Sequence, residues 1–83
     1  VPHMGWNAVS ELKTGLFDGL ADGCFVYFVH SFAAAVCSDT IAVSDNGRAF
    51  SAAMRRDNFY GVQFHPEKSG EVGEMILRNF MNL

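Results

Sequence analysis

The chain has 83 residues, which limits it to one small domain. Its composition, with 49% hydrophobic, 13% aromatic and 18% charged residues, is typical of a globular protein and not of a disordered one. The formal charge is −3 and the six basic residues are scattered, so nothing indicates a nucleic-acid or anionic-membrane surface, and a small-molecule or protein partner fits better.

The two cysteines, Cys24 and Cys37, lack the spacing of a disulfide framework, which favours reduced thiols in a cytoplasmic protein. A single disulfide between them stays open as an alternative. We expect neither a secretory leader nor a membrane span, since no apolar run is long enough. The three histidines are dispersed, so we predict no metal and no cofactor.

The first third of the chain predicts a loop, a helical turn and a strand. Residues 1–7 contain Pro, Gly and Trp in an irregular run that predicts an ordered loop. Residues 8–22 have a weak helical period interrupted by Gly15 and Gly19, so we expect a short helical turn within a loop. Residues 24–29 are β-branched and aromatic, which predicts a strand buried on both faces.

The middle of the chain predicts an antiparallel meander. Residues 36–44 and 50–55 are strand candidates, and the Asn46-Gly47 pair between them is the strongest hairpin signal in the sequence. A second reversal at residues 56–58 leads into a strand over residues 60–64. The meander therefore ends at His65.

The last segment changes to a helical period. Ser69 is the predicted N-cap, and Glu71 would lie near the positive end of the helix dipole. We expect a helix over residues 70–82 that packs across the sheet and holds the His65 loop through its first turn. Its apolar face recurs every three or four residues and consists of Val72, Ile76, Phe80 and Leu83.

An imidazole and a carboxylate follow the last strand, separated by one proline. Pro66 favours an extended His65, which puts the His65 and Glu67 side chains on the same side. The carboxylate could then accept the imidazole N–H, fix its tautomer and stabilise the imidazolium, as the acid of a nucleophile–base–acid triad does. The alternative is a surface loop in which the two residues merely flank a strand end.

Three sequence blocks resemble one enzyme family. The run GVQFHPEKSG at residues 61–70 resembles the closing motif of class I glutamine amidotransferases. Within that family, VPHMGWN at residues 1–7 and YFVHSF at residues 27–32 are similar to the amidotransferase subunits of imidazole glycerol phosphate synthase. The blocks occur in the family's order and roughly its spacing, so the resemblance covers nearly the whole chain.

The resemblance implies an α/β fold, the carboxyl-terminal portion of a flavodoxin-like amidotransferase domain, with mostly short antiparallel strands and one C-terminal helix. We expect residues 1–83 to form a single partial domain, without the amino-terminal half that supplies the nucleophilic cysteine in the family. Neither Cys24, which enters a predicted buried strand, nor Cys37, which follows an alanine-valine run, has the strained, electropositive setting that a nucleophile needs.

The resemblance also assigns the site residues. His65 would be the catalytic base and Glu67 the acid that orients it. Ser31 and Phe32 would contact the glutamine substrate, with His30 in support. Family members commonly have Tyr at the position of Phe32, so this chain lacks a hydroxyl there, although the ring can still stack. The residues alone favour the other explanation, a strand end at which His30 and Ser31 are satisfied by hydrogen bonds.

The resemblance also implies a partner interface. By resemblance, Met4, Trp6, Asn7, Tyr27 and Lys68 would face the cyclase subunit of the synthase, with Lys68 in a salt bridge. The residues alone leave other readings open, because loop aromatics usually pack into their own core and an isolated lysine is usually solvated.

The implied function is hydrolysis of glutamine to glutamate and ammonia, with the ammonia passed to the cyclase that makes imidazole glycerol phosphate in histidine biosynthesis. We expect the 83 residues to be inactive alone. The competing hypothesis is a non-catalytic interaction module that binds the cyclase or self-associates, because an unpaired sheet edge favours association.

Overall fold

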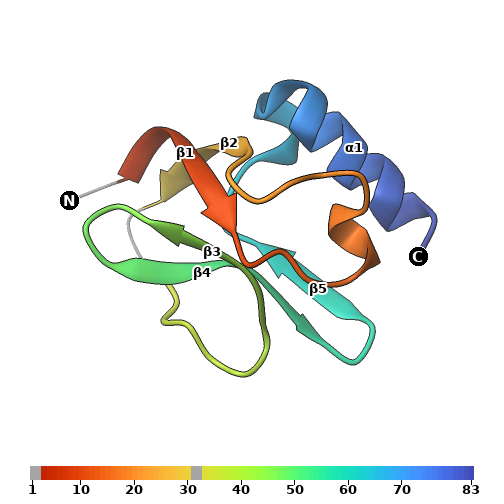
Figure 1. Cartoon of the computed structure of the whole chain (residues 1–83), viewed down its shortest axis with the longest axis horizontal. Helices are drawn as coiled ribbons and strands as arrows, with labels where there is room; N and C mark the ends of the chain where they lie inside the picture. The colour runs from red at the N-terminus through yellow and green to blue at the C-terminus, as the bar shows by residue number, and fades with distance from the viewer. Residues whose placement is uncertain (1–2, 31–32) are drawn as a thin grey trace.

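The computed structural model describes residues 3–30 and 33–83 and has an α/β fold, as predicted. Its elements in chain order are β1 (His3–Ser10), η1 (Gly15–Phe17), β2 (Phe25–His30), β3 (Thr40–Asp45), β4 (Ala49–Arg56), β5 (Phe59–Val62), η2 (Pro66–Lys68) and α1 (Gly70–Met81). The strands form one curled sheet in the order β2-β1-β3-β4-β5, every neighbouring pair is antiparallel, and α1 packs on one side (Figure 1). None of the described helices has the length and hydropathy needed to cross a membrane.

The strand β1 replaces the loop that the sequence predicts at the start of the chain, so that prediction was wrong. It pairs with β2 from His3 opposite His30 to Ala8 opposite Phe25, and then with β3 through Val9 and Ser10. The extended conformation depends on hydrogen bonds to strands that lie far along the sequence, and a local pattern rich in Pro and Gly does not reveal such partners.

The strand β2 forms where the sequence predicts it, but only one of its faces is buried. Val26 and Phe28 are fully buried, whereas Phe25 is 53% and Val29 is 37% exposed. The prediction of burial on both faces was therefore wrong. An antiparallel strand with one face on the core and one face outward shows this alternation, and Val26 and Phe28 belong to the buried hydrophobic cluster.

The predicted meander is present as β3, β4 and β5. The Asn46-Gly47 pair forms the first reversal, where Gly47 has a φ of 113° and its N–H donates to the Asp45 carboxylate at 2.8 Å. Asp57, with a φ of 55°, lies in the second reversal. The strand β3 begins later than predicted, at Thr40, and pairs with β4 through a register shift.

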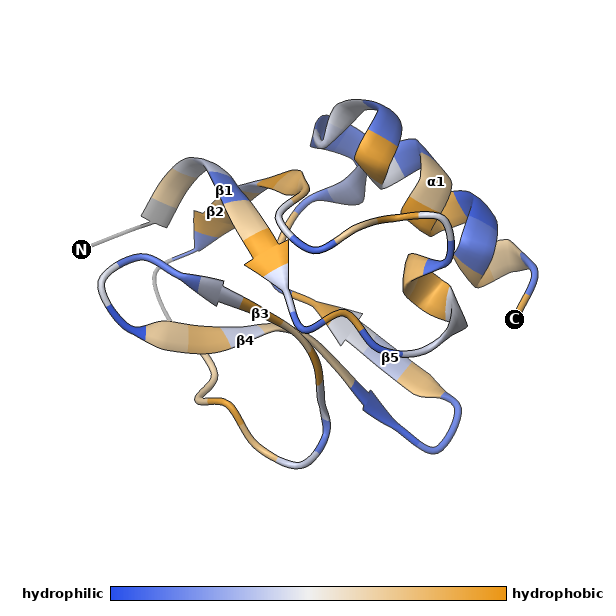
Figure 2. Ribbon diagram, in the orientation of Figure 1, coloured by the Kyte–Doolittle hydropathy of each residue, from blue (hydrophilic) through white to orange (hydrophobic). Residues whose placement is uncertain are grey.

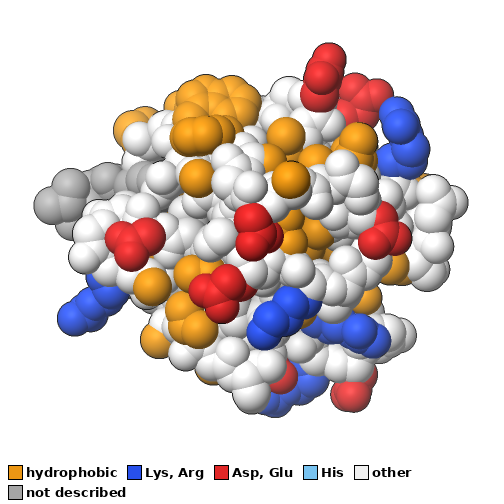
Figure 3. All heavy atoms as spheres, viewed as in Figure 1, with side chains coloured by type: hydrophobic (Ala, Val, Ile, Leu, Met, Phe, Trp, Pro, Cys, Tyr) orange, Lys and Arg blue, Asp and Glu red, His pale blue; other side chains and the backbone are white. Residues whose placement is uncertain are grey.

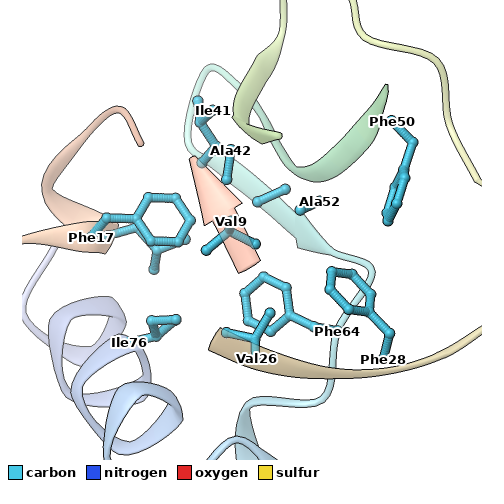
Figure 4. Close-up of a cluster of buried hydrophobic side chains, with 12 residues drawn as sticks. Val9, Phe17, Val26, Phe28, Ile41, Ala42, Phe50, Ala52, Phe64 and Ile76 are labelled. Atoms are coloured by element: carbon cyan, nitrogen blue, oxygen red, sulfur yellow. The ribbon is translucent and has the colours of Figure 1, made fainter. Parts of the chain in front are cut away.

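The core joins the two ends of the sheet. Phe28 of β2 forms an isolated antiparallel bridge with Phe64, which follows β5, so the sheet curls back on itself. The Phe28 ring makes edge-on contacts with Phe50 and Phe64, with centroids 5.4 and 6.0 Å apart. Figure 4 shows these rings next to residues from α1, the η1 loop and the other strands: Val9, Phe17, Val26, Ile41, Ala42, Ala52 and Ile76.

The helix α1 spans nearly the predicted residues. Gly73 and Ile76 are its buried residues, and Figure 2 shows apolar and polar residues alternating around its ribbon. Leu77 and Phe80 are about half exposed, so the apolar stripe is wider than the face that the described core covers. Ser69 stands at the N-cap position, but its hydroxyl makes no capping bond, contrary to the prediction, because it is bonded to other backbone groups.

Candidate catalytic site

The structure brings His65 and Glu67 together at the end of the meander. His65 is extended, with φ −103° and ψ 99°, and Pro66 then begins the short helix η2, which turns the chain by Glu67. His65 Nδ1 and Glu67 Oε2 are 3.0 Å apart, and the two side chains are 39% and 61% exposed. One edge of the imidazole therefore faces a carboxylate, and part of the ring is open to solvent.

The hydrogen bond sets the charge of the Glu67 carboxyl and the tautomer of the His65 ring. It holds the pKa of the Glu67 carboxyl below its ordinary value of 4.5, with a smaller contribution from a hydrogen bond to the Glu67 backbone N–H. At neutral pH the carboxylate is charged and accepts the proton on Nδ1 of His65. In the neutral ring, Nε2 is then the basic nitrogen, and it is available for proton transfer to and from a reacting group.

His30, predicted to support the substrate, lies at the end of β2 against aromatic rings. Its ring centroid is 5.4 Å from that of Phe28 and 5.2 Å from that of Phe50. These contacts place the His30 ring at the border of the core. The predicted substrate residues Ser31 and Phe32 lie outside the described residues.

Three of the five predicted partner residues share one surface. Met4 and Trp6 on β1 are 69% and 54% exposed, and Trp6 lies opposite Tyr27 of β2, with ring centroids 5.7 Å apart in an edge-on contact. The exposed apolar side chains of Phe25 and Val29 have the same orientation, because they alternate with buried residues along β2. We call these five residues the outer β1–β2 face, and Figure 3 shows hydrophobic side chains gathered at the surface over the start of β1.

The other two predicted partner residues are not among the five that make up the outer β1–β2 face. Asn7 follows Trp6 and therefore points to the opposite side of the strand. Its Nδ2 donates to the Asp45 carbonyl at 2.8 Å, so it links β1 to the end of β3. Lys68 is exposed at the end of η2, next to the candidate site.

The two cysteines are free thiols in the structure. Cys24 is half-buried and Cys37 is exposed. Burial raises the pKa of the Cys24 thiol, and the charge of Asp22 adds to this effect. Cys24 is thus mainly the neutral thiol at neutral pH, which is the less nucleophilic form.

Ser69 contacts the backbone of the candidate site. The sequence analysis predicted it only as an N-cap and missed this contact. It is 1% exposed, and its hydroxyl bonds to the backbone of both Tyr27 and His65. The only sequence signal is a small hydroxyl residue four positions after the histidine, and the contact with Tyr27 depends on the tertiary fold.

The sequence of this chain matches a known protein family. A model of the family described as "Glutamine amidotransferase class-I" matches residues 1–83. The chain is 55% identical over 83 residues to the imidazole glycerol phosphate synthase subunit HisH of Bacteroides thetaiotaomicron, covering all of this chain and 42% of that protein. It is 57% identical over 83 residues to the protein of that name from Shewanella loihica, covering all of this chain and 37% of that protein.

A third relative is the imidazole glycerol phosphate synthase subunit HisH of Escherichia coli O157:H7, 51% identical over 84 residues, with all of this chain and 43% of that protein covered. The chain therefore spans less than half the length of these curated relatives.

Proposed function

Since the chain belongs to the class I glutamine amidotransferase family, we propose that it is the part of a glutaminase that supplies the general base, His65, and the acid that orients it, Glu67. The whole protein would hydrolyse glutamine to glutamate and ammonia. The observation that supports this most directly is the 3.0 Å contact between His65 Nδ1 and Glu67 Oε2, beside a ring that keeps solvent access.

The proposed reaction uses a cysteine thiol from outside these 83 residues. Nε2 of His65 takes the thiol proton, and the thiolate attacks the carboxamide carbon of glutamine. His65 then gives the proton to the leaving ammonia, and a thioester remains. Water, deprotonated by His65, hydrolyses the thioester to glutamate and restores the thiol. Glu67 stabilises the imidazolium in both steps, and Ser31 and Phe32, supported by His30, would hold the glutamine.

The partner would be the cyclase subunit of imidazole glycerol phosphate synthase, which takes up the ammonia in histidine biosynthesis in the cytoplasm. The name shared by the relatives supports a subunit role. Exposed aromatic residues favour a protein interface, because Trp and Tyr are enriched among the residues that dominate binding. The outer β1–β2 face and Lys68 would form this chain's side of a heterodimer, with Asn7 holding β1 in place from behind.

The test is glutamate release by the full-length protein together with its cyclase. We expect His65→Ala to abolish release, because no other group would move the proton. We expect Glu67→Gln to lower kcat by about 100-fold, the lower end of the contribution of general acid–base catalysis. Glu74→Gln is the matched control, since Glu74 is also an exposed carboxylate in a 3.0 Å ion pair, with Arg78. Full activity of the His65 variant would reject the proposal.

The second candidate is a non-catalytic module that self-associates. It is favoured by the exposure of Phe59, Phe80 and Met81, which are 76%, 51% and 80% exposed. Size exclusion of the 83-residue chain, combined with a glutaminase assay of the full-length protein with its cyclase, separates the candidates, because only the first predicts glutamate release that depends on His65. We expect the chain alone to release no glutamate, and glutamate release that His65→Ala abolishes would show that the nucleophile lies within these residues.

A further inference from the structure

The hydroxyl of Ser69 joins the strand β2 to the loop that contains His65. Its oxygen accepts a hydrogen bond from the backbone N–H of Tyr27 at 2.9 Å and donates one to the backbone carbonyl of His65 at 2.6 Å. The side chain is 1% exposed, so water does not compete for these bonds. Because a hydroxyl has one hydrogen to donate, the Ser69 proton is committed to the His65 carbonyl.

His65 is bonded to the same residue of β2 through its other backbone group. The His65 N–H donates to the Tyr27 carbonyl at 2.9 Å. In an antiparallel ladder, the residues of a hydrogen-bonded pair exchange two direct N–H···O=C bonds. Here one bond is direct, and the Ser69 hydroxyl relays the other, which holds the His65 backbone to β2 at the point where the chain leaves the sheet.

The first turn of α1 keeps Ser69 in this position. The Gly73 N–H donates to the Ser69 carbonyl at 3.2 Å. A Cβ at Gly73 would lie 1.9 Å from the Pro66 carbonyl oxygen and 2.9 Å from Ser69 Cβ, so the helix and the His65 loop are in backbone contact. Ser69 cannot move without moving this loop.

We propose that Ser69 is a positioning residue for His65, and the inference rests on the proposed catalytic role of that histidine. Glu67 sets the rotation and the tautomer of the imidazole. It does not fix the place of the His65 backbone, because an exposed ion pair holds its geometry weakly. The Ser69 hydroxyl fixes that backbone relative to β2, and thereby fixes where Nε2 stands relative to the thiol and the substrate.

The experiment uses the full-length protein with its cyclase, as Ser69→Ala and Ser69→Cys. A misplacement on the order of 1 Å can cost about 100-fold in rate, so we expect Ser69→Ala to lower kcat by about 10- to 100-fold. The KM for glutamine should stay close to the unmodified value, because Ser69 does not touch the substrate. Ser69→Cys keeps a weak S–H donor and should recover part of kcat.

The matched control is Ser51→Ala on β4. Ser51 is fully buried, and its hydroxyl bonds to Thr40 Oγ1 at 2.5 Å and to the Ala35 carbonyl at 2.9 Å. The variant therefore removes a buried hydroxyl that makes two hydrogen bonds, as Ser69 does, but that does not contact His65. We expect little change in kcat. Hydrogen exchange of the His65 backbone N–H, which is bonded to Tyr27, should become faster in Ser69→Ala and stay unchanged in Ser51→Ala, while the tautomer of the His65 ring, set by Glu67, stays the same in both.

The outcomes separate the two proposals. An unchanged kcat in Ser69→Ala, or an equal loss of kcat in the Ser69→Ala and Ser51→Ala variants with exchange of the His65 N–H unchanged, would overturn the positioning role and leave the proposed function standing. Full activity of His65→Ala would overturn the proposed function itself. If Ser69→Ala does not fold, Ser69→Cys decides: a lower kcat at unchanged KM supports the inference, and an unmodified kcat together with faster exchange of the His65 N–H contradicts it.

Discussion

At the scale of single residues, the site combines an exposed ion pair with a buried backbone tether. The His65–Glu67 contact is open to solvent, so it orients the imidazole more than it stabilises the fold. The hydrogen bonds of the His65 backbone to Tyr27 and Ser69 are sheltered from water. The exposed ion pair adjusts the proton affinity of the imidazole, and the sheltered hydrogen bonds determine where the His65 backbone lies.

The lowered pKa of Glu67 predicts a pH-dependent contribution to stability. A carboxyl group whose pKa is lower in the folded state stabilises the fold above its unfolded pKa and loses this contribution as the pH falls through the folded value. The difference in unfolding free energy between the unmodified protein and Glu67→Gln should therefore shrink as the pH falls below about 4.5. Urea unfolding at a series of pH values measures it, and a difference that grows as the pH falls below about 4.5 would contradict the assignment.

The sequence identifies one half of this site and not the other. Pro66 restricts the backbone between His65 and Glu67, so their spacing alone predicts which side chains face each other. Ser69 meets Tyr27 only through the fold, so local spacing predicts an N-cap and misses the relay. The contacts of Ser31 and Phe32 depend on residues outside the described structure and stay predictions.

At the scale of elements, α1 docks through a residue without a side chain. The space above Gly73 is filled by the backbone of Pro66, so the helix approaches η2 as closely as two backbones allow. Hairpins and the helix were predicted because Asn46-Gly47 and the apolar period of α1 are local signals. The strand β1 was not predicted, because its partners β2 and β3 are supplied by distant parts of the chain.

Gly73→Ala tests this docking. In an open helix the change would stabilise the protein by about 1 kcal/mol. Here the added Cβ meets a carbonyl oxygen that cannot turn aside, and overpacking costs about 1–3 kcal/mol, so we expect a net destabilisation. Urea unfolding measures it, with Gly61→Ala as the control, because nothing lies within 4 Å of a Cβ at Gly61. Equal stability of both variants would exclude a tight contact at Gly73.

At the scale of the whole molecule, exposed apolar side chains lie on the outer β1–β2 face, on α1 and on β5. Phe80 of α1 contacts Tyr60 of β5, whereas Phe59, the strand neighbour of Tyr60, points to the other side of β5. Contiguous exposed apolar surface marks contact sites with other chains or segments.

Trp6→Ala should weaken binding of the full-length protein to the cyclase by about tenfold or more, the loss typical of a central aromatic residue. The control is Phe59→Ala, which removes an aromatic ring that is 76% exposed on β5, away from the outer β1–β2 face. Titration calorimetry compares the two variants. If Phe59→Ala weakens binding and Trp6→Ala does not, the cyclase docks elsewhere.

The bridge between Phe28 and Phe64 has a consequence for how the molecule is made. It joins two segments with the whole meander between them, and such distant pairings form slowly because a long loop must close first. The hairpins can form while the chain emerges from the ribosome, but Tyr27 gains its bonds to His65 and Ser69 only once residues 65–69 have been synthesised. Until then, the inner strand edge of β2 stays open to wrong pairing in the nascent protein.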